Sequence, residues 1–89
     1  MRFSLDAYLI DLVAEHLKLP VDELEFDKDL DEYGLDSIEA GALLHKMSKT
    51  FGDIPQSLFL EHRTLDDVRA FLRQNFAREI KALDRKSVV

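Results

Sequence analysis

Apolar residues recur at intervals of three or four positions in three stretches of this 89-residue chain, and a proline lies between each stretch and the next. That spacing places the apolar side chains along one face of an α-helix. Pro20 and Pro55 interrupt the pattern, because proline has no backbone N–H and its ring clashes with the preceding helical turn. Three glycines and two prolines are also too few for the many turns of an all-β fold. The sequence therefore predicts an all-α fold.

Capping residues define the expected ends of these helices. Ser4 is expected to cap a first helix over residues 5–18, and Thr64 to cap a last helix that continues to residue 76. One short helical turn is expected over residues 57–61. Together these elements predict a small bundle of three main helices plus one short helix.

The second helix is expected over residues 37–50, directly after a sharp turn at Gly34. Asp36 and Glu39 have the spacing of a capping box, with Asp in place of Ser or Thr. This spacing makes Asp36 the N-cap and Ser37 the first helical residue. The Ser37 side chain is then expected to point outward at the start of the helix.

The charge of the chain is unevenly distributed. The formal net charge is −6, which argues against nucleic acid as a partner. Residues 22–39 alone carry nine acidic residues and one lysine, a charge of −8. They overlap a long connection over residues 20–35, whose recurring leucines predict that it is held against the core. The acidic segment is either a solvated loop or a surface that steers basic partners toward residue 37.

The composition also excludes several classes of site. The chain contains no cysteine, so it can form neither a disulfide nor a thiolate metal site. No apolar run approaches the ~20 residues of a membrane-spanning helix. Asp6 and Asp11 interrupt the first apolar stretch, which is not expected of a signal peptide. We expect a cytoplasmic monomer that does not bind membranes.

Ser37 lacks the sequence context of a catalytic nucleophile. A serine needs a base to activate it and a further group to orient that base. His45 lies two turns further along the same predicted helix, so its imidazole cannot reach the Ser37 hydroxyl. His16 and His62 lie on other predicted elements. The sequence therefore disfavours a serine hydrolase.

A calcium loop is the second chemistry that the acidic connection suggests. Asp29, Asp31, Gly34 and Ala40 fall at positions 1, 3, 6 and 12 of a calcium-binding loop. Position 12 must supply a bidentate glutamate, and Glu39 is one residue out of register. The sequence therefore predicts no metal site.

Covalent modification suits the position of Ser37 better. The first turn of a helix has free N–H groups and a partial positive charge, which tolerate a phosphate ester. An outward hydroxyl beside a turn is also accessible to a modifying enzyme. The alternative is that Ser37 is only a polar residue at a helix start, where serine is common.

A family resemblance favours modification. The stretch GLDSI at residues 34–38 resembles the attachment motif of acyl carrier proteins. The likeness covers residues 5–76 and includes FGDIP at 51–55, LFLE at 58–61 and TL at 64–65. The second block resembles carrier domains of modular polyketide synthases more than the stand-alone carriers of fatty acid synthesis.

This resemblance implies a cofactor and a role for each motif residue. Ser37 would carry 4′-phosphopantetheine, which a phosphopantetheinyl transferase moves from coenzyme A. Asp36 would cap the helix and contact the transferase, and Leu35 and Ile38 would flank the arm. The arm's thiol would hold an acyl chain as a thioester. The protein would then catalyse nothing itself and would present intermediates to an acyltransferase, a ketosynthase or other synthase enzymes.

The expected partner surface carries both signs of charge. Asp31, Glu32 and Glu39 place acidic groups near Ser37, whereas His45 and Lys46 make the second half of the helix basic. Carriers of this family often display acidic residues along the whole helix. A partner enzyme built for a wholly acidic helix is therefore expected to bind poorly.

Two alternative functions remain open on the sequence. The first is an aryl or peptidyl carrier of a nonribosomal peptide synthetase. Peptide carriers usually have Gly-Gly before the His/Asp-Ser pair, whereas Tyr33 and Gly34 precede Leu35 here. The second alternative is a helical protein-interaction module that is never modified.

Two features depart from what a carrier fold needs. Gly41 lies inside the predicted second helix, where glycine costs about 1 kcal/mol relative to alanine. It is explained either by close packing against another helix or by space for the arm or a partner. Residues 77–89 extend past the carrier domain expected over residues 1–76. They are predicted to form a C-terminal helical extension or linker, or alternatively a docking or dimerisation helix.

Overall fold

The computed structural model describes residues 4–87, and every regular element that it assigns there is helical. This confirms the predicted all-α fold. In chain order the elements are α1 (Leu5–Leu17), the 3₁₀ turns η1 (Val21–Glu23) and η2 (Leu30–Tyr33), α2 (Ser37–Phe51), α3 (Leu58–Glu61), α4 (Leu65–Asn75) and α5 (Ala77–Ser87). Among the described residues, no helix has both the length and the apolar character needed to cross a bilayer.

The three predicted N-caps are all present. The Ser4 hydroxyl accepts a hydrogen bond from the Ala7 N–H at 3.2 Å, and the Thr64 hydroxyl accepts one from the Asp67 N–H at 3.2 Å. The Asp36 carboxylate accepts the Glu39 N–H at 2.8 Å. Each bond satisfies one of the N–H groups that a first helical turn leaves free. The helix starts predicted from the sequence are therefore correct.

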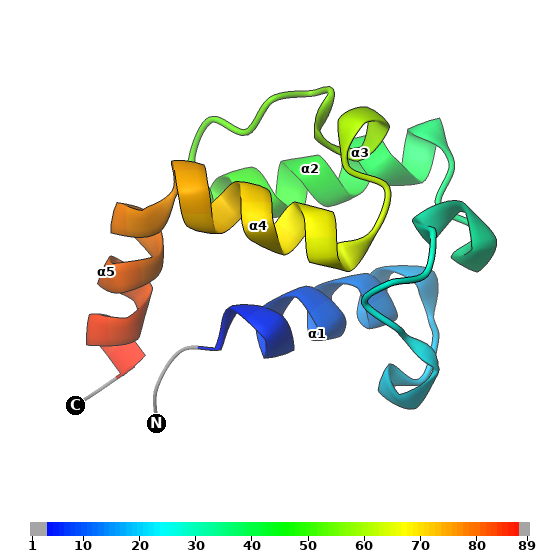
Figure 1. Cartoon of the computed structure of the whole chain (residues 1–89), viewed down its shortest axis with the longest axis horizontal. Coiled ribbons are helices and arrows are strands. Elements are labelled where there is room, and N and C mark those ends of the chain that lie inside the picture. Colours follow the sequence, from blue (N-terminus) through cyan, green and yellow to red (C-terminus); the bar gives the residue numbers. More distant parts are fainter. Residues whose placement is uncertain (1–3, 88–89) are drawn as a thin grey trace.

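Helices α1, α2 and α4 run side by side, and α1 is antiparallel to the other two (Figure 1). Their apolar faces meet in one core that α3 and the connection also enter. The completely buried side chains come from each of these elements: Leu9, Val13, Leu30, Leu43, Met47, Leu58, Leu65, Val68 and Leu72. Burying a leucine of this kind stabilises the fold by about 1.5–3 kcal/mol. The periodic apolar residues of the sequence therefore do form the core.

The long acidic connection is fixed to the core, as the sequence predicts. Leu24, Leu30 and Leu35 are all buried. The Leu30 N–H donates to the Arg63 carbonyl at 2.7 Å, which ties the connection to the segment before α4. Gly34 ends η2 with a φ of 91°, a left-handed conformation that glycine adopts without strain. The connection therefore delivers the chain to the start of α2 in a defined direction.

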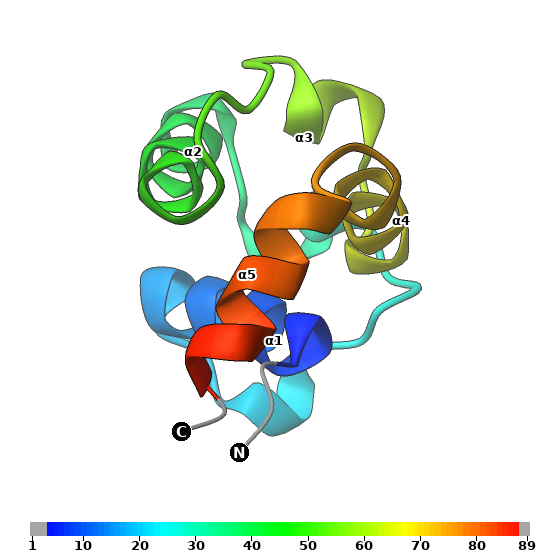
Figure 2. The same cartoon turned by 90° about the vertical axis from the view of Figure 1, so that its left-hand side faces the viewer.

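Helix α5 begins directly after α4 and turns steeply away from the other helices, crossing one end of the bundle (Figures 1 and 2). Phe76 lies at the junction, and Ile80 and Leu83 of α5 are partly buried against the core. The expected C-terminal extension is thus helical over Ala77–Ser87. The division of the chain into a carrier domain and an extension stays a prediction.

Candidate functional site

The Ser37 side chain is exposed at the first residue of α2, as the sequence predicts. Three preceding residues fix its position. Gly34 provides the left-handed turn, Leu35 is anchored in the core at 6 % exposure, and Asp36 caps the helix. The hydroxyl is therefore held at the surface by a turn, an anchor and a cap.

No described histidine is placed as a base for Ser37. His16 faces the Glu39 carboxylate, and the His62 ring packs on Phe71 with the ring centroids 5.0 Å apart. His45 is exposed two turns further along α2. None of these histidines is therefore positioned to activate Ser37 as a nucleophile.

The Glu39 side chain does not complete the capping box. Its carboxylate lies 2.7 Å from His16 Nε2, on the neighbouring helix α1. Lys46 Nζ lies 3.3 Å from the other ring nitrogen, Nδ1. Glu39 and Lys46, both predicted to bind partners, therefore also link α2 to α1 through His16. A polar residue on the apolar face of the predicted first helix was the sequence signal for this cluster.

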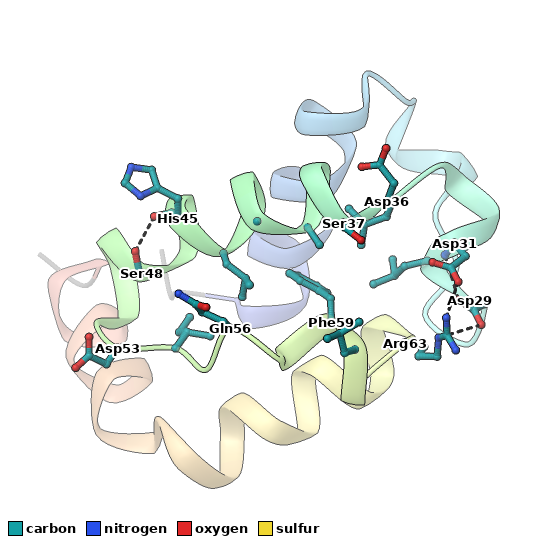
Figure 3. A pocket seen from close by; sticks show the side chains of 17 residues that line it. Asp29, Asp31, Asp36, Ser37, His45, Ser48, Asp53, Gln56, Phe59 and Arg63 are labelled. Carbon is teal, nitrogen blue, oxygen red and sulfur yellow. Dashed lines mark hydrogen bonds and ion pairs between the residues drawn. The ribbon is translucent and has the colours of Figure 1, made fainter.

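Arg63 also contributes to this region, although nothing in the sequence indicated it. Its guanidinium Nη2 lies 2.7 Å from a carboxylate oxygen of Asp31, and its Nε lies 3.9 Å from Asp29 (Figure 3). An arginine thus contacts the two aspartates that resemble calcium ligands. Among the described residues there is no cluster of three or more side chains suited to a metal ion. Glu32, the remaining acidic residue of the predicted partner surface, is exposed.

A cavity of about 900 Å³ lies beside Ser37. It is bounded by one side of α2, by α3, by the segment between these helices and by the end of the acidic connection (Figure 3). Ser37 and Leu35 line it, and Phe59 extends from α3 toward α2. Its lining mixes apolar side chains with polar ones, as ligand sites do. Of the two residues expected to flank an arm, only Leu35 lines the cavity.

Two apolar side chains near this cavity are largely exposed. Ile38 is 80 % exposed and does not line the cavity, whereas Leu60 is 78 % exposed and does. Ile38 follows Ser37 directly, so it exposes apolar surface next to that residue, whereas Leu60 shares the cavity with Ser37. A single exposed aliphatic side chain is common on proteins, but Leu60 in the cavity and Ile38 next to Ser37 together offer apolar surface to another molecule.

Comparison with known protein families identifies this region. The family model described as "Phosphopantetheine attachment site" matches residues 7–72, which contain the Ser37 turn and the cavity. The match covers well over half of the chain. No solved structure matches this chain significantly.

The curated relatives include several polyketide synthases. Polyketide synthase PksM of Bacillus subtilis is 36 % identical over 66 residues, which cover 74 % of this chain and 2 % of the relative. Polyketide synthase ThaG of Burkholderia thailandensis is 34 % identical over 77 residues, covering 86 % of this chain and 1 % of the relative. Polyketide synthase PksL of Bacillus subtilis is 30 % identical over 82 residues, which cover 91 % of this chain and 2 % of the relative. This chain thus spans a very small part of these relatives' length.

The structure and the comparisons agree with the resemblance seen in the sequence. The fold is helical, the matched residues include an exposed serine at a helix start, and the relatives are synthases that contain a similar segment. The prosthetic group that such an attachment site implies is 4′-phosphopantetheine. The chain belongs to the phosphopantetheine attachment-site family and is a carrier domain homologous to those of polyketide synthases.

Proposed function

We propose that Ser37 is the residue that carries 4′-phosphopantetheine, and that the chain presents polyketide or related acyl intermediates to partner enzymes. One observation carries this proposal: the exposed Ser37 hydroxyl lies at the start of α2 and at the edge of the cavity, inside the family match. When bound, the group supplies a thiol that holds an acyl chain as a thioester.

The residues around Ser37 fit a phosphodiester. The first N–H groups of α2 have no intrahelical partner, and the positive end of the helix dipole favours an anion there. The Asp36 carboxylate is engaged with the Glu39 N–H, and the Glu39 carboxylate faces His16. Both nearby acids are thus directed at groups of the protein. The start of α2 can therefore accept a negative group despite the acidic sequence around it.

The transfer to Ser37 needs a base from outside this chain. The new bond joins Ser37 Oγ to the pyrophosphate phosphorus of coenzyme A that is esterified to pantetheine. The P–O bond between the two pyrophosphate phosphorus atoms breaks, and adenosine bisphosphate leaves with its electron pair. The serine proton goes to a base on the transferase, because the described histidines contact other groups or lie too far away. Asp36 orients the hydroxyl through the cap and is a contact for the transferase. The chain itself is non-catalytic.

Partner enzymes of a synthase, such as an acyltransferase or a ketosynthase, would meet a surface of mixed character. Ile38 and Leu60 provide its apolar part. Glu32 provides an exposed acidic group and His45 an exposed basic one. Asp31 is also predicted to contribute, although Arg63 partly neutralises it. Such partners are expected to rely on apolar contact near Ser37 as well as on charge.

The comparisons support a polyketide carrier over a carrier of a peptide synthetase. The relatives described above are polyketide synthases by name. Tyr33 and Gly34 also replace the Gly-Gly pair usual in peptide carriers. No feature of the cavity favours the aryl or peptidyl alternative.

Intact-mass measurement tests the proposal. The protein is incubated with coenzyme A and a broad-specificity phosphopantetheinyl transferase, together with Ser37→Ala and Ser48→Ala. Ser48 is the matched control, because it lies on the same side of α2 and lines the same cavity. The parent and Ser48→Ala should each gain the mass of one arm, and Ser37→Ala should gain none. An unmodified parent, or a modified Ser37→Ala variant, would contradict the proposal.

A further inference from the structure

Gly41 lies within α2, one helical turn after Ser37. An interior glycine weakens a helix relative to alanine, so its presence needs a reason. Close packing is not that reason, because a Cβ built on Gly41 meets no atom of a neighbouring element within 4 Å. The backbone is not the reason either, since the glycines with positive φ are Gly34 and Gly52. The explanation by close packing is therefore wrong.

Gly41 does form part of the cavity. Ser37, Gly41, Leu44 and Ser48 follow one another at intervals of four, three and four residues, and all four line the cavity. At 1.5 Å per residue, this strip runs along α2 for about 16 Å, with Gly41 about 6 Å from its start. Ala40 is the neighbouring lining residue. The first turn of α2 after Ser37 thus gives the cavity only a methyl group, from Ala40, and the bare backbone of Gly41.

The opposite wall supplies apolar surface. Ile54, Phe59 and Leu60 line the cavity from the segment after α2 and from α3. Leu60 is 78 % exposed, so a molecule in the cavity would cover a side chain that is otherwise in water. An acyl chain tethered to Ser37 is present beside this surface at high effective concentration. Tethering therefore favours the acyl chain over any free ligand. The tethered acyl chain is therefore the occupant that the geometry favours.

We propose that Gly41 is a specificity-determining residue of this carrier, which leaves the wall of α2 clear so that an aliphatic acyl chain can lie between Gly41 and Phe59. This inference rests on the proposed function, because the acyl chain is held by an arm on Ser37. A larger side chain at position 41 projects into the cavity beside the arm. Such a side chain would exclude the acyl group from the cavity and leave that group in solvent.

The test compares the protein loaded with octanoyl-phosphopantetheine and with unacylated phosphopantetheine, each transferred from its coenzyme A form. Backbone amide NMR spectra of the two loaded forms are recorded for the parent, Gly41→Ala, Gly41→Leu and Ala42→Leu. Ala42 is the matched control, because it is the next residue of α2, is exposed and does not line the cavity. Intact mass reports loading separately for every variant.

The parent and Ala42→Leu should show acyl-dependent shifts at Leu44, Ser48 and Phe59. Gly41→Ala should reduce these shifts, and Gly41→Leu should abolish them while still gaining the full mass of the arm. Unloaded Gly41→Ala should melt about 4–8 °C above the parent, since it removes an interior glycine that nothing packs against.

Several results would overturn the inference. Acyl-dependent shifts that persist in Gly41→Leu, or are absent in the loaded parent, show that Gly41 does not admit the acyl chain. Slower loading of Gly41→Leu with unchanged shifts assigns the glycine to approach of the transferase instead. A lower melting temperature of Gly41→Ala assigns it a structural role. If the parent gains no mass, the proposed function is wrong, and the inference about Gly41 is wrong as well.

Discussion

Asp36 combines two roles at a single residue, and these can be separated. Its carboxylate caps α2, and the proposed function also makes it a contact for the transferase. Asp36→Ala removes the cap and should lower the free energy of unfolding by about 1 kcal/mol. Asp36→Asn keeps a capping oxygen without the charge, so its stability should stay close to that of the parent. Denaturant unfolding measures both variants.

The rate of loading completes this comparison. If the carboxylate contacts the transferase, Asp36→Asn should load more slowly than the parent although it is equally stable. Equal loading rates for the parent and Asp36→Asn would restrict Asp36 to its capping role.

Ionisation of Tyr8 should make the free energy of unfolding vary with pH in the alkaline range. Burial raises the pKa of Tyr8 above its usual value of about 10, and a hydrogen bond with the Thr50 side chain partly opposes this shift. The folded state therefore favours the neutral phenol. Its contribution to stability is fully present below about pH 10 and is lost as the pH rises through the higher folded-state pKa.

The variant Tyr8→Phe tests this dependence. The free energy of unfolding should fall more steeply between pH 9 and pH 11 in the parent than in Tyr8→Phe, because only the parent has this phenol to ionise. The slopes are compared rather than the absolute stabilities, since the substitution also removes the hydrogen bond with Thr50. Parallel curves for the two proteins would contradict the prediction.

Local features were predictable from the sequence residue by residue, whereas tertiary contacts were not. The Asp36 cap depends only on residues three apart, and the predicted bond to the Glu39 N–H is present. The partner of the Glu39 carboxylate is His16, which lies 23 positions earlier in the sequence. Arg63 contacts Asp31, which lies 32 positions earlier in the sequence. Such pairs depend on how the helices pack, and sequence periodicity does not specify that.

At the scale of elements, the helix starts were predicted better than the helix ends. The first helix was expected to include Lys18, but α1 ends at Leu17 and Lys18 adopts the left-handed conformation with φ of 58°. The last predicted helix was expected to reach Phe76, and the chain instead breaks there between α4 and α5. Helix ends lack side-chain caps as specific as those at the starts, so the sequence signal for them is weaker.

Helix α5 offers an element-scale prediction about residues 77–89. Ile80 is partly buried and packs against the core, whereas its neighbour Lys81 is exposed. Ile80→Ser should lower the free energy of unfolding by about 1–2 kcal/mol, because it returns apolar surface to water. Lys81→Ser is the control and should change stability by less than about 0.5 kcal/mol. Equal stabilities of the two variants in denaturant would show that α5 contributes little to the fold.

For the whole molecule, the structure changes what the charge pattern means. The sequence places a charge of −8 in residues 22–39. In the folded chain Arg63 contacts Asp29 and Asp31, and His16 contacts Glu39. Part of the acidic surface that the sequence predicted is thus already paired within the molecule. Exposed Arg–Asp pairs add little stability, but the Arg63 charge lowers the net negative charge of this surface.

The charge distribution along α2 leads to a prediction about partner choice. A fatty acid synthase enzyme that binds a wholly acidic helix should bind this carrier weakly, because the second half of α2 is basic. Lys49 is exposed in that half, and Lys49→Glu should strengthen the binding. Titration calorimetry of the parent and the variant measures the effect. Equal affinities would show that this charge does not govern partner choice.

The central claim is that the hydroxyl held at the start of α2 is the point of attachment. Fragmentation mass spectrometry of the protein after incubation with coenzyme A and transferase tests this most directly, because it locates the added group on a single residue. The account predicts that the whole added mass lies on Ser37. An added mass on any other residue, or a fully unmodified Ser37 after prolonged incubation, would contradict it.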